Sequence, residues 1–295
     1  MKKAWLIIAL SFITVGIMIF MGLMTMLDWN FKKISTAKYQ TVTHSITDDF
    51  DSISVDSSIA KINFVVSDEN KIECLENKKI PYSVTVKDGV LTIGETDNRK
   101  WYDHIGIFFE MPEITLNLSK TQLAELTVKN TTGDVNIVNG FSFTTADVHL
   151  TTGDIKYFAD TSESLKMRTT TGDIEAGGAS PETVNAMSTT GEIELTDITC
   201  DNLTAGASTG DINLSNVVAT EKLNIKCTTG DVVFEKCDAG EINAKTTTGD
   251  ISGSLLTEKV FITKTSTGKI TVPQTLSGGK CELKTTTGDI KIMIE

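Results

Sequence analysis

The sequence is poor in the residues from which catalytic and metal sites are usually built. Among its 295 residues are five cysteines, three histidines and three tryptophans. No two cysteines have the C-x-x-C spacing of zinc or redox sites, and His44, His104 and His149 lie far apart. Neither a P-loop nor a dinucleotide-binding fingerprint is present. We therefore expect a protein that is not an enzyme and that holds no cofactor and no metal ion.

Basic and aromatic residues are also scarce. The chain has 27 Lys and Arg against 39 Asp and Glu, a net charge of −12, which argues against nucleic acid as a partner. Residues 131–295 contain no tryptophan and only one tyrosine, Tyr157. Polysaccharide-processing enzymes line their grooves with aromatic side chains. A solenoid enzyme acting on an envelope glycan is therefore the less favoured alternative.

A short repeat dominates the C-terminal half. Thr-Gly, followed by an acidic and then an aliphatic residue, recurs nine times at intervals of 19 or 20 residues, with Lys269 as the one departure from acidity. A period this regular indicates one structural unit stacked on itself. We call the repeated glycines the corner glycines. They are Gly133, Gly153, Gly172, Gly191, Gly210, Gly230, Gly249, Gly268 and Gly288.

Within each repeat, apolar and polar residues alternate as they do in a strand with one buried face. Counted from the corner glycine as zero, positions −7 and −5 are mostly apolar, position −3 is small or weakly polar, and position −1 is always threonine. The alternation predicts that all four point inward. Position +2 is always Val or Ile, so the alternation slips by one residue at the glycine. Such a slip indicates a corner, which glycine accommodates because it adopts backbone angles that other residues resist.

We predict an all-β fold: a single-stranded β-solenoid, similar to a β-helix, of about nine rungs of 19–20 residues, preceded by one transmembrane helix. Rungs would stack at ~4.8 Å into a rod on the order of 40 Å long. The alternative is a pair of twisted antiparallel sheets in which the same segments form hairpins. Cys227, Cys237 and Cys281 fall at inward positions and are expected in the core.

The first residues predict a membrane anchor. Residues 4–27 carry no charge and would extend about 36 Å as a helix, enough to cross a bilayer core of roughly 30 Å. We expect an anchor at 1–27, a polar spacer at 28–40, a β-rich N-terminal part or cap at 41–125, and the repeat solenoid at 126–295. Asp88-Gly89 predicts a hairpin within the cap. The alternative is a signal peptide cleaved near Ser35 and Ala37.

The orientation in the membrane does not follow from charge alone. Lys2 and Lys3 precede the apolar run, and Lys32, Lys33 and Lys38 follow it. Because a short basic N-terminus resembles a signal anchor, we expect a single-pass protein of the bacterial cell membrane with most of the chain outside the cytoplasm. At the other end, residues 290–295 stop within a rung, and this apolar edge is expected to be open to pairing with a partner.

Two charged rows follow from stacking the repeats. Position +1 is acidic in eight of nine units, and these acids are expected to cap turns or, as the alternative, to bind calcium. Position −4 is often cationic, most densely at Lys226, Lys245, Lys264 and Lys284. We expect these lysines either to maintain solubility or to contact an anionic polymer or lipid headgroups.

The repeated TTGDI string, as at residues 170–174 and 286–290, resembles a bacterial family of unknown function named "putative adhesin". The resemblance covers roughly residues 45–295 and implies a surface or envelope protein with a β-solenoid-like domain, often with an N-terminal membrane helix. It implies no catalytic residues.

Taken together, these patterns predict a membrane-anchored, extracytoplasmic β-repeat protein with a binding, adhesion or envelope-scaffold role. The partners would be the membrane and an anionic cell-wall polymer or a membrane protein. A regulator of envelope stress that acts through membrane partner proteins is the further alternative.

Overall fold

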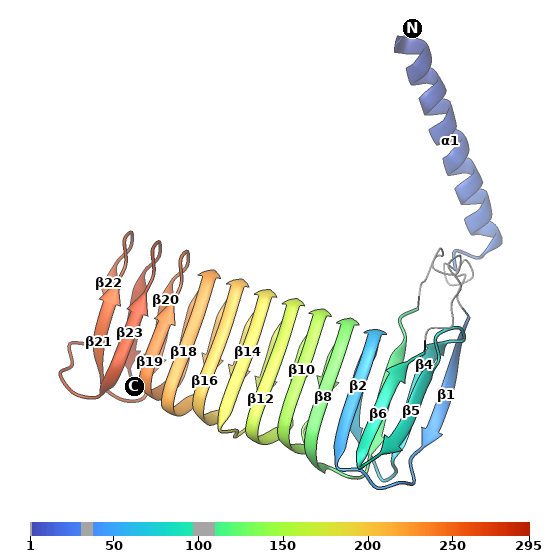
Figure 1. Ribbon diagram of the computed structural model, residues 1–295. Helices are drawn as coiled ribbons and strands as arrows, with labels where there is room; N and C mark the ends of the chain where they lie inside the picture. Colours follow the sequence, from blue (N-terminus) through green and yellow to red (C-terminus); the bar gives the residue numbers. More distant parts are fainter. Residues whose placement is uncertain (1, 31–37, 97–109) are drawn as a thin grey trace.

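The computed structural model describes residues 2–30, 38–96 and 110–295. The chain forms one N-terminal helix, α1 (Lys2–Met26), followed by a long stack of strands (Figure 1). The spacer lysines Lys32 and Lys33, the cleavage candidates Ser35 and Ala37, and His104 lie outside the described residues.

Helix α1 is apolar along most of its length. Its segment Ile7–Met26 has a mean hydropathy of 2.5, and most of its described side chains are exposed, among them Leu10 and Phe12. The exposure of so many apolar side chains to water is unfavourable. By length and composition the helix can cross a membrane, a property that it shares with signal sequences.

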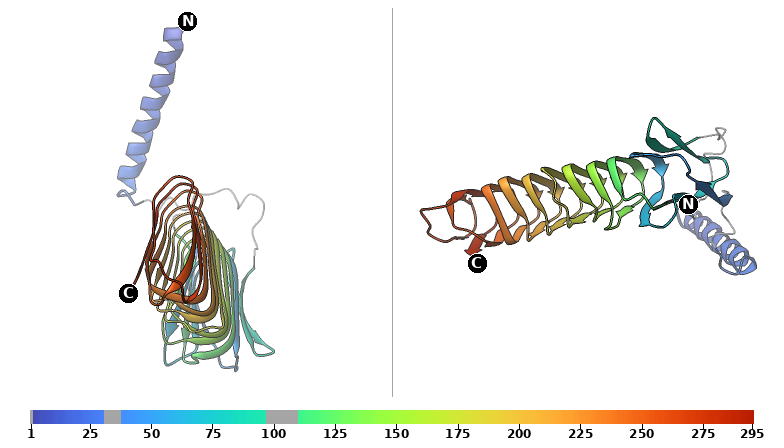
Figure 2. Two further views of the ribbon diagram at one scale, coloured as in Figure 1. Left: turned by 90° about the vertical axis from the view of Figure 1, so that its left-hand side faces the viewer. Right: turned by 90° about the horizontal axis from the view of Figure 1, so that it is seen from below.

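Each repeat forms one rung of a β-solenoid, and the predicted fold is confirmed. In the rung of Gly172, the long strand β12 (Asp160–Thr171) leads into the corner, and the short strand β13 (Ile174–Gly177) follows it. β12 pairs in parallel with the long strands of the neighbouring rungs, and β13 pairs with their short strands. The solenoid thus has a long-strand sheet and a short-strand sheet (Figure 2). The parallel pairing excludes the alternative of antiparallel hairpins for the repeats.

The remaining long strands follow the same pattern. They are β8 (Gln122–Thr132), β10 (Ser142–Thr152), β14 (Thr183–Thr190), β16 (Thr199–Thr209), β18 (Val218–Thr229), the second half of β19 (Val232–Lys245), β21 (Lys259–Lys264) and β23 (Gly279–Lys284). The remaining short strands are β9 (Val135–Ile137), β11 (Ile155–Tyr157), β15 (Ile193–Thr196), β17 (Ile212–Ser215), the first half of β19, β20 (Ile251–Leu255), β22 (Ile270–Thr271) and β24 (Ile290–Ile294).

The segment before the repeats contains both degenerate rungs and a cap. β2 (Ser52–Ile59) and β3 (Lys61–Val66) pair in parallel with β8 and β9, and β6 (Val90–Glu95) and β7 (Glu113–Leu118) stack outside them. β1 (Tyr39–Ser45), β4 (Lys71–Asn77) and β5 (Tyr82–Lys87) then close this end by antiparallel pairing. The predicted hairpin joins β5 to β6, with φ of 52° at Asp88 and 80° at Gly89.

The last two rungs are exchanged relative to their order in the sequence. β23 pairs with β19 on one side and with β21 on the other, and β24 likewise lies between β20 and β22. The expectation that residues 290–295 form the open edge is therefore wrong, and Ile290 and Ile292 are buried. Within the described residues, β21 and β22 pair on one side only and form the outer edge.

An ion pair spans the inserted strand. Lys259 of β21 is opposite Gly279 of β23, and its Nζ lies 2.5 Å from Asp238 Oδ1 of β19. A Cβ at Gly279 would lie 2.0 Å from the carbonyl oxygen of Gly240. β23 can therefore pack against β19 at this point only because residue 279 is a glycine. Because Lys259 is 4% exposed, losing Asp238 would leave a buried charge without its partner.

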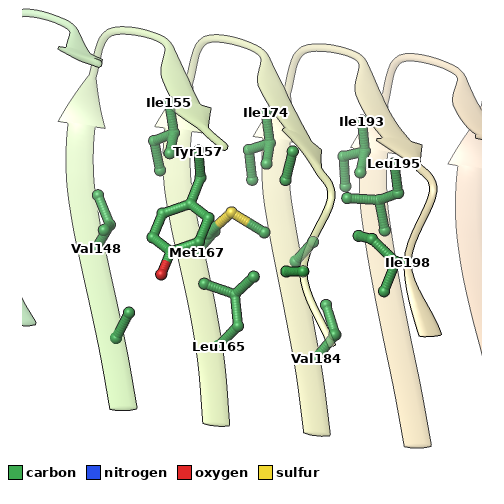
Figure 3. Packing of buried hydrophobic residues seen from close by; sticks show 14 of the residues in the cluster. Val148, Ile155, Tyr157, Leu165, Met167, Ile174, Val184, Ile193, Leu195 and Ile198 are labelled. Carbon is green, nitrogen blue, oxygen red and sulfur yellow. The ribbon is translucent and has the colours of Figure 1, made fainter. Parts of the chain in front are cut away.

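The core lies between the two sheets. Figure 3 shows Leu165 and Met167 of β12 beside Ile155, Tyr157 and Ile174 of the short strands. All five cysteines are buried and free, which confirms the prediction for Cys227, Cys237 and Cys281. Burial raises the pKa of Cys74, Cys200 and Cys281 to about 12, so these thiols stay protonated and unreactive at neutral pH.

One part of the inward pattern is wrong. The residues at −7, −5 and −3 are largely buried, but the threonines at −1, such as Thr152, Thr171 and Thr190, are exposed. The residues at −2 are exposed as well. Two successive exposed residues show that the chain starts to turn before the glycine, so the alternation already ends at position −3.

Candidate functional site: a cationic column on the long-strand sheet

The residues at position −4 form one column on the outer face of the long-strand sheet. Strand register places each opposite its counterpart in the next rung. We call this row the cationic column. In spatial order it consists of Lys129, His149, Arg168, Met187, Gly206, Lys226, Lys245, Lys284 and Lys264.

The structure brings together the four lysines singled out from the sequence. Lys226 is opposite Lys245, Lys245 is opposite Lys284, and Lys284 is opposite Lys264. The exchange of the last two rungs reverses the order of the last two lysines but leaves the row unbroken. The four ammonium groups therefore stand on adjacent strands, which are spaced at ~4.8 Å.

Among the residues that the structure describes, Lys284 is the one of these four lysines that has an ion-pair partner. Lys284 and Lys280 both form ion pairs with Glu282, and their hydrogen bonds hold the pKa of Glu282 at about 2. That carboxylate therefore stays ionised at neutral pH. Within the described residues, Lys226, Lys245 and Lys264 form no ion pair, and all three are exposed.

The column is interrupted by a depression centred on Gly206. It has a volume of about 600 Å³, and Arg168 and His149 lie on one side of it while Lys226 lies on the other. Polar side chains of Thr170, Thr189, Thr204, Ser208 and Asn224 contribute to its lining. Sequence reasoning missed this feature. The available signal was the run of small residues at 205–208. This run places a glycine at position −4, where the other repeats carry mostly large side chains.

The acidic row is a hydrogen-bonded ladder between rungs. The backbone N–H of Asp173 donates to Asp154 Oδ1 at 2.8 Å, and the N–H of Glu192 donates to Asp173 Oδ1 at 2.7 Å. The same bond recurs along the stack and ends where Lys269 donates to Asp289 Oδ1 at 2.7 Å. Each such carboxylate thus satisfies the amide of the neighbouring rung. The described residues hold no group of three or more His, Cys, Asp or Glu side chains that could bind a metal ion.

The corner glycines lie in one column inside this ladder. A Cβ at Gly172 would lie 2.0 Å from the carbonyl oxygen of Gly153, and the other corner glycines meet a backbone oxygen of the adjacent rung just as closely. At position −3, Thr169 Oγ1 donates to the carbonyl of Gly153 at 3.1 Å, and Ser188 Oγ donates to Gly172 at 3.0 Å. The corner is therefore a packed, hydrogen-bonded seam.

The histidines are not brought together. His149 lies on the cationic column, whereas His44 lies on β1 in the cap, where it pairs opposite Ile72. The five cysteines are distributed through the core, and none of them lines the depression.

Comparison of the sequence with models of protein families identifies the family of this chain. The model of the family described as Toastrack DUF4097 matches residues 50–293, and the chain belongs to this family. The resemblance drawn from the TTGDI repeats is thereby confirmed. No curated protein matches the sequence of this chain.

Solved structures with some similarity to this chain are also known. A crystal structure of a "putative adhesin" from Parabacteroides distasonis ATCC 8503 has a TM-score of 0.51 at 13% identity, over 87% of this chain and 98% of that one. At this identity the likeness shows the fold alone. A "putative adhesin" from Bacteroides fragilis NCTC 9343 has 18% identity and a TM-score of 0.47, over 87% and 97% of the two chains. A "putative lipid binding protein" from P. distasonis has 15% identity and a TM-score of 0.47, over 88% and 98%.

Proposed function

We propose that this member of the Toastrack DUF4097 family is a non-catalytic binding protein of the bacterial cell envelope. Helix α1 anchors it in the cell membrane as a single-pass protein, with the spacer, the cap and the solenoid outside the cytoplasm. The cationic column binds an anionic envelope polymer, and Lys226, Lys245 and Lys264 are its main contacts.

The observation that carries this proposal is the row of uncompensated lysines. Two ammonium groups at the strand spacing of ~4.8 Å repel each other by about 1 kcal/mol in water. The same face pairs Lys280 and Lys284 with Glu282, so carboxylates are available there as partners. At Lys226, Lys245 and Lys264 the repulsion is left unrelieved by the described residues, and a bound polyanion would relieve it.

The geometry of the column suits an extended ligand. The lysines stand on successive parallel strands, so they form a straight row along the axis of the solenoid. A polymer with regularly spaced negative charges can contact several of them at once, and such multivalent contact raises the overall affinity beyond that of one site. Because exposed charges are screened within about a Debye length, the binding should weaken as salt increases.

The test replaces the three unpaired lysines in the full chain, held in nanodiscs of neutral lipid. We expect Lys226→Glu, Lys245→Glu and Lys264→Glu together to weaken binding of dextran sulfate and of polyphosphate by at least about tenfold at low salt. Calorimetry or biolayer interferometry measures the affinity, and the wild-type affinity should fall steeply as salt is added.

The matched control carries the same change of charge elsewhere. Lys61, Lys87 and Lys291 are exposed and lie off the column, so their joint replacement by Glu lowers the net charge equally. This control should bind both polyanions nearly as the wild type does. Equal loss in the two triple variants would show that only net charge matters, and the proposed function would then be wrong.

A further inference from the structure

The cationic column is interrupted where two successive members carry no charge. Arg168 and Lys226 stand three strands apart, which corresponds to about 14 Å, with Met187 and Gly206 between them. The gap coincides with the depression of about 600 Å³. A ligand lying along the column therefore meets positive charge, then a hollow without charge, then positive charge again.

The glycine that forms the hollow is not required by the backbone. Gly206 lies within β16 and is absent from the glycines with positive φ. Glycine in the interior of a strand is less favourable than alanine. A Cβ at this position would meet the Met187 Sδ at 2.7 Å, which is the movable end of a flexible side chain. The absence of a side chain at Gly206 therefore lets the flexible Met187 side chain lie across this position, low on the floor of the depression.

The polar groups around the hollow are available to a ligand. Among the described residues, the side chains of Thr170, Thr189, Ser208 and Asn224 make no hydrogen bond. Met187 adds a half-buried apolar surface beside Gly206. Unengaged hydroxyl and amide groups around an apolar patch match the hydroxyls and the C–H face of a sugar ring. A bare phosphate chain offers no group of this kind to the hollow.

We propose that the depression at Gly206 is a subsite for an uncharged sugar ring of an anionic glycan. The anionic groups on either side of that ring lie over Arg168 with His149 and over Lys226. This inference rests on the proposed function, because it specifies which class of polyanion the cationic column selects.

Filling the hollow without changing any charge tests the subsite. We expect Gly206→Val, in the full chain in neutral nanodiscs, to weaken binding of dextran sulfate about tenfold while leaving polyphosphate within about twofold of wild type. The dextran sulfate for this test is sparsely sulfated, so that uncharged sugar rings lie between its charged ones, whereas polyphosphate has no sugar ring. Asn243→Val serves as the control, since it adds the same side chain to the same sheet outside the hollow, and it should alter neither affinity.

The variant should remain folded, because valine favours strands and the backbone at Gly206 is ordinary. The melting temperature checks this, and Gly206→Ala, which adds one methyl group, gives a second and smaller reduction in dextran sulfate affinity. Unchanged dextran sulfate binding by Gly206→Val, or equal loss for both polyanions, would overturn the subsite while the lysine variants still uphold the column. Failure of the lysine variants to weaken either polyanion, or a wild type that binds neither, would overturn the proposed function and the subsite with it.

Discussion

Each corner glycine is required for two independent reasons. At Gly210 the backbone has φ of 131°, a region that residues with a Cβ rarely adopt, and a Cβ would lie 2.1 Å from the carbonyl oxygen of Gly191. The neighbouring Asp211 has a less stringent role. Its Oδ1 accepts the backbone N–H of Asp231 at 2.8 Å, and an asparagine oxygen can accept the same bond.

These two residues give a paired prediction. Gly210→Val should lower the free energy of unfolding by roughly 3 kcal/mol or more, because strain and steric overlap add. Asp211→Asn should change it by about 1 kcal/mol or less, because the hydrogen bond between rungs is kept. Chemical denaturation of both variants measures the difference, and similar losses would contradict the roles assigned to the corner and the ladder.

Lys269 shows how one residue sets the end of the stack. The other eight TTGDI-type repeats have an acid at this position, and Glu192 alone among them directs its carboxylate to the side chain of Asn213 rather than to the next amide. Lys269 donates its own amide to Asp289, but no rung of the described chain lies beyond it to need an acceptor. The exception in the repeat is therefore explained by its place at the edge.

At the scale of elements, the insertion of β23 and β24 is the main departure from a simple repeat. The rung of Gly288 has an acid and can serve a further rung, whereas the rung of Gly268 cannot. The Lys259–Asp238 ion pair reaches across β23 at Gly279, which has no side chain in the way, so the pair is compatible with the exchanged order. The acid at the rung of Gly288 is therefore the feature that favours the exchanged order over the order of the sequence.

Engineered disulfides test this order directly. Thr247→Cys with Thr286→Cys should form a disulfide, since these exposed residues lie on neighbouring rungs and the N–H of Thr286 donates to the carbonyl of Thr247 at 3.2 Å. Thr247→Cys with Ser266→Cys should not, because the strands are two spacings or about 10 Å apart, beyond the reach of a disulfide.

Thr286→Cys with Ser266→Cys provides the positive control, as these residues are again on neighbouring rungs. Gel mobility and mass spectrometry under oxidising conditions distinguish the three variants, and the native thiols do not compete because they are buried. A disulfide in the 247/266 pair but none in the 247/286 pair would show that the rungs stack in sequence order.

At the scale of the whole molecule, the two ends of the solenoid differ. Antiparallel strands β1, β4 and β5 close the end that follows α1, whereas the far end exposes Val260, Ile262 and Ile270 of β21 and β22. The charge is also distributed unequally. Among the described residues of a chain of net charge −12, Lys226, Lys245 and Lys264 form a row without ion pairs on one face, so the proposed attraction to polyanions would be local and not a property of the net charge.

The anchor gives a prediction at this scale. Because residues 4–27 carry no charge and α1 exposes most of its apolar side chains, we expect the full chain to stay in the membrane fraction through alkaline extraction. Mass spectrometry of that fraction should recover peptides of α1. A membrane-free protein that begins after residue 35 would instead show that the helix is a cleaved signal sequence.

The sequence by itself determined the rung. The spacing of the corner glycines, the apolar alternation up to position −3 and the branched residue at +2 all act within one repeat, where local backbone geometry decides the outcome. These signals were sufficient for the solenoid, the buried cysteines and the column of lysines. They misplaced the threonines at −1, because alternation does not report where a chain starts to turn.

Only the tertiary structure decided which rungs are neighbours. Near-identical repeats can stack in more than one order, and the choice depends on contacts between distant residues such as Lys269 with Asp289. The depression at Gly206 also arises only when strands from separate repeats lie side by side, since its lining comes from β10, β12, β14, β16 and β18. A periodic sequence specifies the unit that is repeated, whereas the differences between units specify their order and the surface that they form together.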